Sequence, residues 1–370
     1  MKKKIAILPG DGIGPEIIRE AVKVLKAVEK SSGAGFEFRE GVIGAVAIDK
    51  CGDPYPPETH KLCISSDAVL FGAVGDPKYD NNPAAKIRPE QGLLRMRKEL
   101  GLYANIRPVE LFWGQYNRSP LKEEVVRNTD MVIVRELTGG IYFGEPRGRS
   151  DDRQEAFDTC RYTTGEILRI SEKTFNLAEK RRGVVTLVDK ANVLETSRLW
   201  REVVTRLHKD KYSHLILDYL YVDNAAMKIV TNPSAFDVIL TENMFGDILS
   251  DLASVLTGSV GLLASASCGT GVSLYEPVHG SYPQAAGLDK ANPLATILSA
   301  AMMLDDSFGM HRESNLIRNA CRAIIEKGIV TEDLSDGKDY FTTSEVGDAV
   351  AKQIIELVKN IKPLSCPEVG

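Results

Sequence analysis

Short apolar segments alternate with amphipathic ones along most of this chain, and this alternation is the feature that most restricts its fold. Runs of the length and composition of β-strands occupy residues 5–8, 67–72, 131–134, 184–188, 215–222 and 236–240. Apolar residues at helical spacing follow several of them, at residues 166–181, 193–207, 246–256, 293–303 and 346–358. Such alternation predicts an α/β protein with a mainly parallel sheet.

Length and charge set limits on organisation and partners. A chain of 370 residues predicts two domains, because single cores rarely grow that large. The formal net charge of -5 and the lack of a long basic run argue against nucleic acid as a partner. No apolar stretch is long enough for a membrane span, and residues 5–8 are too few for a signal-peptide core. Six scattered cysteines without a C-x-x-C pair predict a reduced, cytoplasmic protein.

A glycine-rich loop, Gly10-Asp11-Gly12-Ile13-Gly14, follows the first strand and precedes a helix. Its G-x-G-x-G spacing differs from the dinucleotide fingerprint G-x-G-x-x-G, and no acid follows at the usual distance. A tight turn that needs permissive backbone angles also explains these glycines. The spacing favours the turn over a classical Rossmann site.

Two aspartates, Asp247 and Asp251, lie four residues apart in a helical segment, so their carboxylates share one face. Like charges at this spacing repel by a few tenths of a kcal/mol, roughly 0.2–0.5, unless a cation joins them. Mg²⁺ suits carboxylate oxygens and keeps coordination positions open for a substrate. On the pattern alone, a solvated helix face near an N-terminus remains the alternative.

Two arginines lie in or at the ends of apolar, strand-like segments, Arg107 in residues 104–108 and Arg135 in residues 132–136; Arg97 precedes them. A guanidinium in such a setting needs a partner, and a bidentate carboxylate matches it best. A structural salt bridge, for example between Arg135 and Glu136, is an equally good explanation.

One lysine, Lys190, directly follows the strand-like residues 184–188 and Asp189. Ligands of α/β proteins gather at the carboxyl ends of strands, and a lysine there can be tuned towards a general base. An ordinary exposed loop lysine is the commoner case.

Six strings, taken together, resemble the β-decarboxylating isocitrate/isopropylmalate dehydrogenase family. Any one could arise by chance, but their number and order could not. They are Leu8-Pro9-Gly10-Asp11-Gly12-Ile13-Gly14-Pro15-Glu16, Ile87-Arg88-Pro89-Glu90-Gln91-Gly92-Leu93-Leu94, the ten residues from Arg135 to Gly144, Asp189-Lys190-Ala191-Asn192, the Asp247/Asp251 segment, and Glu276-Pro277-Val278-His279-Gly280-Ser281.

The resemblance implies a two-domain α/β fold with a mainly parallel sheet that is not a classical Rossmann fold. Residues 1–102 and 258–370 would form the first domain and hold most of the cofactor site. Residues 103–257 would form the second, with the metal site, the dimer interface and an intersubunit arm at about residues 144–164. Members are typically homodimers with shared active sites.

The resemblance also implies roles in catalysis. Arg97, Arg107 and Arg135 would bind the two carboxylates of a small diacid. Lys190, from the partner subunit, would accept the proton of the C2 hydroxyl while hydride leaves for the nicotinamide. Tyr142 would protonate C3 after CO₂ departs.

A divalent metal, Mg²⁺ or Mn²⁺, would be bound by Asp247 and Asp251. Asp223 from the partner subunit would complete the site and contact the substrate.

Two leucines bear on the substrate. Leu93 and Leu94 lie on the segment that meets the substrate side chain in this family, where isocitrate-specific members have small polar residues. Leucines would pack an isopropyl group but leave an extra carboxylate unpaired; they could also simply belong to a core, with Leu100.

The cofactor implied is NAD. The glutamine at position 284 replaces an aspartate common in NAD-specific members, but it supplies no positive charge for a 2′-phosphate, and the lysine–tyrosine pair of NADP-using relatives is absent. The expected contact residues are Gly75, Glu90, His279, Gly280, Ser281, Gln284 and Asn292.

The expected activity is oxidative decarboxylation of (2R,3S)-3-isopropylmalate to 4-methyl-2-oxopentanoate and CO₂ with reduction of NAD, in leucine biosynthesis. The alternatives are a dehydrogenase of homoisocitrate, isocitrate, malate or tartrate, and a catalytically silent regulatory subunit.

Overall fold

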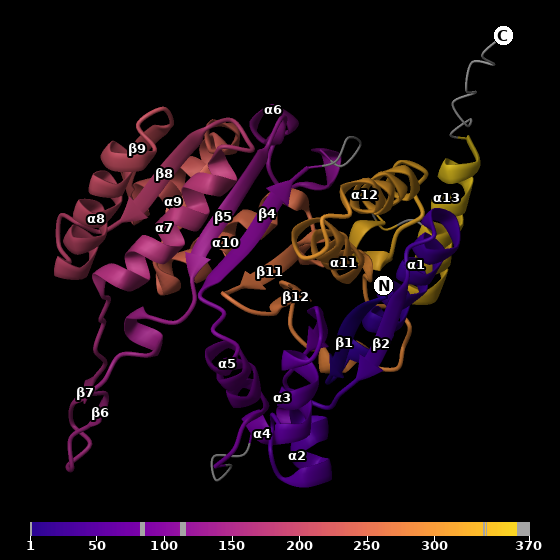
Figure 1. The fold of residues 1–370 in the computed structure, drawn as a ribbon, viewed down its shortest axis with the longest axis horizontal. Helices are drawn as coiled ribbons and strands as arrows, with labels where there is room; N and C mark the ends of the chain where they lie inside the picture. The colour runs from indigo at the N-terminus through magenta and orange to yellow at the C-terminus, as the bar shows by residue number, and fades with distance from the viewer. Residues whose placement is uncertain (1, 82–85, 112–115, 336, 338, 361–370) are drawn as a thin grey trace.

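The fold is built around a ten-stranded sheet (Figure 1). The computed structural model describes residues 2–81, 86–111, 116–335, 337 and 339–360. The strand order is β2-β1-β3-β12-β11-β4-β5-β10-β8-β9. In that order the strands are β2 (Phe36–Glu40), β1 (Lys3–Gly10), β3 (Ala68–Ala73), β12 (Ser273–Pro277), β11 (Ala264–Cys268), β4 (Ala104–Glu110), β5 (Asp130–Glu136), β10 (Val238–Thr241), β8 (Val184–Asp189) and β9 (Ile216–Tyr221).

Strand direction divides the sheet into two parallel halves. Every neighbouring pair is parallel except β12–β11, β11–β4 and β4–β5. Three antiparallel steps in succession mean that the half around β1 and the half around β8 run in opposite directions. The mainly parallel α/β fold is therefore confirmed, and its antiparallel centre distinguishes it from an all-parallel Rossmann sheet.

The first half of the sheet is covered on both faces, because successive residues of a strand point to opposite sides. Ile5 and Ile7 pack with one apolar cluster, while Ala6 and Leu8 pack with another. The first cluster includes α1 (Gly14–Ser32), α11 (Leu294–Asp306), α12 (His311–Glu326) and α13 (Thr343–Asn360). The second involves α3 (Pro57–Ile64) and α5 (Pro89–Glu99); the short helices α2 (Ala45–Cys51) and α4 (Pro77–Asp80) lie in the same lobe (Figure 1).

The second half is built in the same way. Val132 and Val134 of β5 pack against α7 (Thr164–Ala178) and α8 (Glu195–Lys211), whereas Met131 and Ile133 pack on the other side. That side holds α6 (Glu123–Val126), α9 (Val222–Thr231) and α10 (Asn243–Ser254). The division into domains at residues 102 and 258 stays a prediction.

The glycine-rich loop is a tight turn, as its spacing predicts. Gly10 and Gly12 have positive φ angles of 71° and 57°. A Cβ on Gly10 would lie 1.9 Å from the carbonyl oxygen of Ala73, so only glycine fits against β3. Between these glycines, the Asp11 carboxylate accepts hydrogen bonds from the backbone N–H groups of Ala45, Val46 and Gly75.

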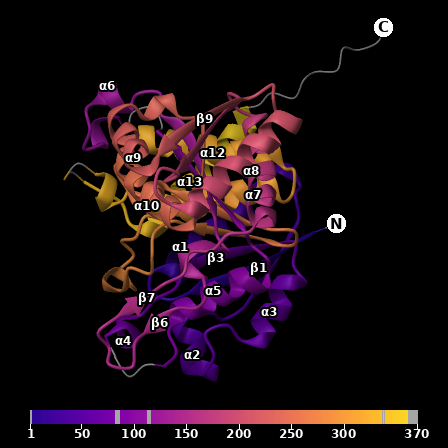
Figure 2. The ribbon, with the colours of Figure 1, turned by 90° about the vertical axis from the view of Figure 1, so that its left-hand side faces the viewer.

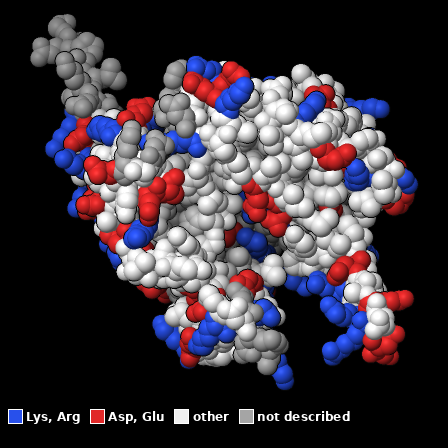
Figure 3. Space-filling view, turned by 180° about the vertical axis from the view of Figure 1, so that it is seen from behind, with Lys and Arg blue, Asp and Glu red and all other residues white. Residues whose placement is uncertain are grey.

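A small hairpin, β6 (Gly148–Arg149) and β7 (Ala156–Phe157), precedes α7 in the chain and projects away from the body of the molecule (Figures 1 and 2). Seen from behind, it carries basic and acidic side chains, and the surface is hollowed between it and the lower lobe (Figure 3). The four residues of its strands are all exposed. Across the described residues, no helix is both long and apolar enough to cross a membrane.

Candidate active site

The centre of the site lies where β4 and β5 pair. In their antiparallel register Asn105 is opposite Arg135, and Arg107 is opposite Ile133. Alternation along the strands puts Asn105, Arg107 and Arg135 on the same face of the sheet. Both arginines are nearly buried, with exposed fractions of 9% and 5%. Burial lowers the pKa of Arg107, and it lowers the pKa of Arg135 to about 10, so Arg135 remains charged near neutral pH.

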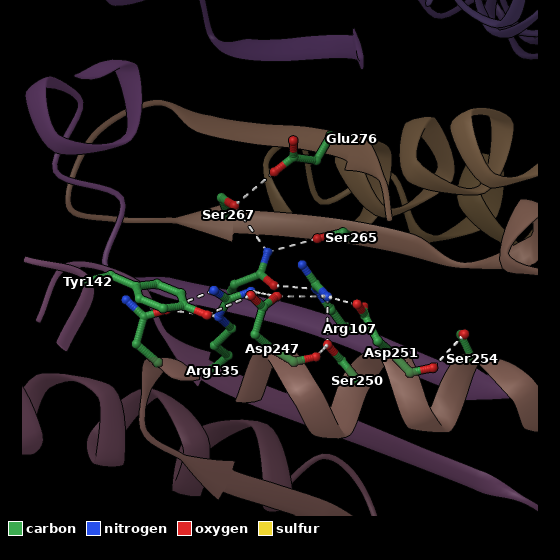
Figure 4. A network of polar contacts seen from close by, with 12 residues as sticks. Arg107, Arg135, Tyr142, Asp247, Ser250, Asp251, Ser254, Ser265, Ser267 and Glu276 are labelled. Atoms are coloured by element: carbon green, nitrogen blue, oxygen red, sulfur yellow. Dashed lines mark hydrogen bonds and ion pairs between the residues drawn. The ribbon is translucent and has the colours of Figure 1, made fainter. Parts of the chain in front are cut away.

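Helix α10 brings the aspartate pair against these arginines (Figure 4). Arg135 Nη1 forms an ion pair with Asp247 Oδ1, and Arg107 Nη1 lies 4.0 Å from the same oxygen. Arg107 Nη1 also lies 3.5 Å from Asp251 Oδ1 and donates to Ser250 Oγ at 2.6 Å. Gly246 permits this approach, because a Cβ there would lie 2.6 Å from Arg135 Cγ.

Tyr142 reaches the same aspartate from the turn after β5. Its hydroxyl donates to Asp247 Oδ2 at 3.1 Å. Burial raises the pKa of Tyr142, and the negative charge of Asp247 adds to the effect. A phenol that stays protonated beside the Asp247 and Asp251 carboxylates can act as a general acid.

A buried polar chain connects Arg97 to this centre. Arg97, on α5, donates from Nη2 to Glu276 Oε1 at 2.7 Å. Ser267 Oγ donates to that oxygen at 3.4 Å and accepts from Asn105 Nδ2 at 3.1 Å. Asn105 Oδ1 in turn accepts from Arg107 Nε at 2.7 Å. Arg97 Nε is buried and has no hydrogen-bond partner among the described residues.

Lys190 and Asp223 lie together but apart from this cluster. Lys190 Nζ donates to Asp223 Oδ1 at 2.7 Å, and this contact lowers the pKa of Asp223. The two residues follow the neighbouring strands β8 and β9. Asp189, just before the lysine, is held by two hydrogen bonds from Arg201, of 2.9 and 2.8 Å.

The two leucines of α5 have different surroundings. Leu93 packs against the apolar cluster around Tyr55 and Met96, whereas Leu94 is 43% exposed. Core packing therefore explains Leu93 in part. Leu94 remains available for contact with a ligand.

Three of the expected cofactor residues, Gly75, Glu90 and Ser281, lie close together. Gly75 has a φ angle of 127°, and a Cβ there would lie 3.1 Å from both Glu90 Oε1 and Ser281 Oγ. The Ser281 carbonyl accepts from Ile13 N at 2.9 Å, which fixes the loop to the glycine-rich turn. These residues form a polar cradle that a side chain at position 75 would fill, and it fits a nucleotide.

The other expected cofactor residues are more spread out. His279 Nδ1 is 3.0 Å from the Gly280 carbonyl oxygen, while its buried Nε2 has no partner in the described part of the chain. Burial lowers the pKa of His279. Gln284 is exposed. Asn292 accepts from Leu294 N at 3.0 Å and donates to Asp333 Oδ2 at 3.0 Å, and its contact with a cofactor stays a prediction.

A divalent metal fits the aspartate pair only in part. Burial raises the pKa of Asp251, Arg107 opposes this rise, and the neighbouring Asp247 adds to it. A cation would relieve that repulsion, and the side chains are 35% and 71% exposed at Asp247 and Asp251. Within the described residues of one chain, however, no three His, Cys, Asp or Glu side chains converge on one point. Further oxygen ligands would have to come from substrate, water or a partner subunit.

Several residues of this centre were not predicted as site residues from the sequence: Asn105, Asn243, Ser250, Ser267 and Glu276. Each is a common residue type whose importance depends on its neighbours in space. Only Asn243 had a local signal, because it lies one helical turn before Asp247.

Comparison with known proteins agrees with this geometry. The family model for isocitrate/isopropylmalate dehydrogenase matches residues 4–350. The chain therefore belongs to the isocitrate/isopropylmalate dehydrogenase family.

Particular relatives narrow the comparison. The chain is 54% identical to the 3-isopropylmalate dehydrogenase of Aquifex aeolicus, over 96% of this chain and 99% of the relative. It is also 54% identical to that of Carboxydothermus hydrogenoformans, over 95% of each. Among solved structures, isocitrate dehydrogenase from Methylococcus capsulatus superposes with a TM-score of 0.85 at 34% identity, covering 95% of this chain and 99% of that one. A β-decarboxylating dehydrogenase from Thermococcus kodakarensis gives 0.79 at 37% identity, covering 97% and 98%.

Proposed function

We propose that this chain catalyses the oxidative decarboxylation of 3-isopropylmalate with NAD, in leucine biosynthesis. The observation that carries the proposal is the convergence of Arg107, Arg135 and Tyr142 on the Asp247/Asp251 pair. Fixed cations for a carboxylate, oxygen ligands for a metal and a protonated phenol are together what this reaction needs. Names of relatives at 54% identity support the same substrate.

The two absent groups would supply specific chemistry: NAD accepts the hydride, and a divalent ion polarises the oxygen at C2. Gly75, Glu90, Ser281 and the exposed Gln284 would hold the dinucleotide. Asp247 and Asp251 would hold Mg²⁺ or Mn²⁺.

The chain's own residues then divide the remaining work. Arg97, Arg107 and Arg135 orient the carboxylates by charge-assisted hydrogen bonds. Lys190 of the partner subunit, as a neutral amine, accepts the C2 hydroxyl proton, and its contact with Asp223 holds the side chain in place. Tyr142 gives a proton to C3, because its phenol is protonated and lies beside Asp247.

Substrate choice rests on α5. An isopropyl group buries well against Leu93 and Leu94, whereas the additional carboxylate of isocitrate would be desolvated there without a partner. The branched diacid is therefore the better match.

A homodimer is part of the proposal, because one chain lacks the third metal ligand. Asp223 lies in the first turn of α9, which packs against α10. Large apolar side chains are exposed on both helices, with Met227 62% and Ile248 57% exposed. Exposed apolar surface of this kind marks protein interfaces. A second copy packed here would bring its own α9 towards the Asp247/Asp251 pair.

Two smaller proposals complete the picture. Residues 144–164, with the exposed hairpin, would interlock the subunits, since so small a hairpin is marginal alone. The five described cysteines are unpaired, which supports a cytoplasmic location; Cys366 lies outside the described residues.

A panel of assays tests the proposal. 3-Isopropylmalate, isocitrate, homoisocitrate and malate are each combined with NAD or NADP, with and without Mg²⁺. We expect the highest kcat/KM for 3-isopropylmalate with NAD, and activity that depends on the metal. A higher kcat/KM for another diacid would refute the substrate, and a lower KM for NADP would refute the cofactor.

A further inference from the structure

Asn243 occupies the junction between the strand β10 and the helix α10. The last residue of β10, Thr241, is paired with Arg135 in the sheet, so the next residues of the chain pass beside that arginine. Asn243 is the first residue of α10 and is only 1% exposed. Its position is therefore fixed by both the sheet and the helix.

Both ends of the Asn243 side chain are engaged by elements of the site. Its Oδ1 accepts from Arg135 Nε at 3.0 Å and from Arg135 Nη2 at 2.8 Å. Its Nδ2 donates to the Gly139 carbonyl oxygen at 3.2 Å. Gly139 directly precedes the turn Gly140–Tyr142, which carries the tyrosine.

We propose that Asn243 is a positioning residue, which aims the Arg135 guanidinium at a substrate carboxylate and holds the Tyr142 turn at a fixed distance from it. The inference rests on the proposed function, since it assigns the same roles to Arg135 and Tyr142.

An amide is suited to both contacts, because it combines an acceptor and a donor without charge. It occupies Nε and Nη2 on one side of the guanidinium, which leaves Nη1 directed towards Asp247. An aspartate at the same place would keep the acceptor but lose the donor to Gly139. It would also place a fixed negative charge beside Arg135, and this charge would compete with the substrate carboxylate for the guanidinium.

The backbone of Asn243 has a contact of its own, which does not depend on the side chain and which holds the start of α10. The Asn243 backbone N–H donates to Tyr162 Oη at 3.0 Å, so the start of α10 keeps one contact whichever side chain is present. Substitution of the side chain should therefore disturb Arg135 and Tyr142 more than the helix.

The test compares Asn243→Ala and Asn243→Asp with the wild type. Binding of 3-isopropylmalate is measured by calorimetry with Mg²⁺ present, and KM is measured for 3-isopropylmalate and for NAD. Loss of charge-assisted contacts typically changes binding by about 10- to 100-fold. We expect both variants to weaken binding of the diacid and raise its KM by that factor, with the KM for NAD changed less than about twofold.

A matched control is Asn176→Ala, which removes an exposed asparagine on α7 whose side chain accepts a hydrogen bond from Tyr212 Oη at 2.9 Å, far from the Asp247/Asp251 pair in the sequence. This variant should bind the diacid as the wild type does. Asn243→Asp guards against misfolding, because it has nearly the same size and shape as the native residue.

The outcomes are distinct. Binding by the variants within twofold of the wild type, or equal rises in the KM for the diacid and for NAD, would overturn the positioning role. Wild-type protein that binds 3-isopropylmalate but does not turn it over would refute the proposed function, while the calorimetric comparison would still decide the role of Asn243.

Discussion

Replacing Asp247 by asparagine separates metal binding from the rest of the site. The carboxylate has three neighbours: the Arg135 guanidinium, the Tyr142 hydroxyl at 3.1 Å, and Arg107 Nη1 at 4.0 Å. Asparagine has the same shape and keeps one oxygen acceptor. The change therefore removes a negative charge and little else.

The cost to folding should be small. Arg135 keeps both hydrogen bonds to Asn243 Oδ1, of 3.0 and 2.8 Å, so the buried guanidinium is not left without partners. The difference between a charged and a neutral hydrogen bond is about 1 kcal/mol. Because the Asp247 side chain is 35% exposed, solvent screens part of this difference. We expect Tm to fall by roughly 2 °C.

The cost to metal binding should be much larger. Loss of residues that only support a metal ligand typically weakens metal affinity by about 10- to 100-fold. Loss of a ligand itself should then exceed about 100-fold, or roughly 2.7 kcal/mol.

The assay is a Mg²⁺ titration of the initial rate at fixed 3-isopropylmalate and NAD, with Mg²⁺ binding checked by calorimetry. Asp49→Asn is the matched control, since this exposed aspartate pairs with Lys78 on the opposite lobe of the molecule. A half-maximal Mg²⁺ concentration within twofold of the wild-type value would refute Asp247 as a ligand. A large fall in Tm with unchanged titration would instead show that Asp247 serves the arginines alone.

Three further predictions test other parts of the site. Tyr142→Phe should slow protonation at C3 more than hydride transfer in single-turnover experiments, and equal slowing of both steps would contradict the acid role. Gly75→Ala should raise the KM for NAD and leave that for the diacid nearly unchanged, because its Cβ would crowd Glu90 and Ser281 at 3.1 Å; equal rises in steady-state KM would show general damage. Burial raises the pKa of Glu242 to about 7, so the native state holds a proton that the unfolded state releases near pH 4.5, and stability falls as pH rises between those values. Glu242→Gln should reduce that fall in urea unfolding between pH 5 and 7, and an unchanged slope would argue against the raised pKa.

Much of the fold could be predicted from periodicity, because buried parallel strands are almost uninterrupted runs of apolar residues. The run at residues 184–188 matches β8, and α7 begins with a capping box in which Thr163 and Glu166 bond to each other's backbone N–H groups. Residues 236–240 were placed two residues early, since Pro233–Ala235 forms a turn before β10 begins at Val238.

Other elements gave weaker signals. The edge strand β2, Phe36–Glu40, has the sequence FEFRE, in which three of five residues are charged, so it does not resemble a buried strand. β11 consists of small residues, Ala264–Cys268, and its burial comes from the sheet around it rather than from hydrophobicity. Strand direction was also beyond periodicity, which is the same for parallel and antiparallel neighbours.

The site divides along similar lines. Spacing alone placed Asp247 and Asp251 on one helix face, and strand-like surroundings drew attention to Arg107 and Arg135. The salt bridge suggested between Arg135 and Glu136 was wrong: Glu136 accepts from the backbone of Thr138 and Gly139, and Arg135 turns to α10 instead. Contacts between distant segments decide such choices, and one sequence does not contain them.

The antiparallel pairing of β4 and β5 fixes the distance between the backbone positions of Arg107 and Arg135. Arg107 and Arg135 occupy diagonal positions of the ladder, and diagonal neighbours lie about 7–8 Å apart, as the backbone hydrogen bonds dictate. Both arginines lie on paired strands and not on a loop, so their separation cannot increase to fit a longer substrate. The enzyme should thus tolerate changes in the bulk of the branch, which on the proposed function would face the exposed Leu94, far better than one added carbon between the acid groups.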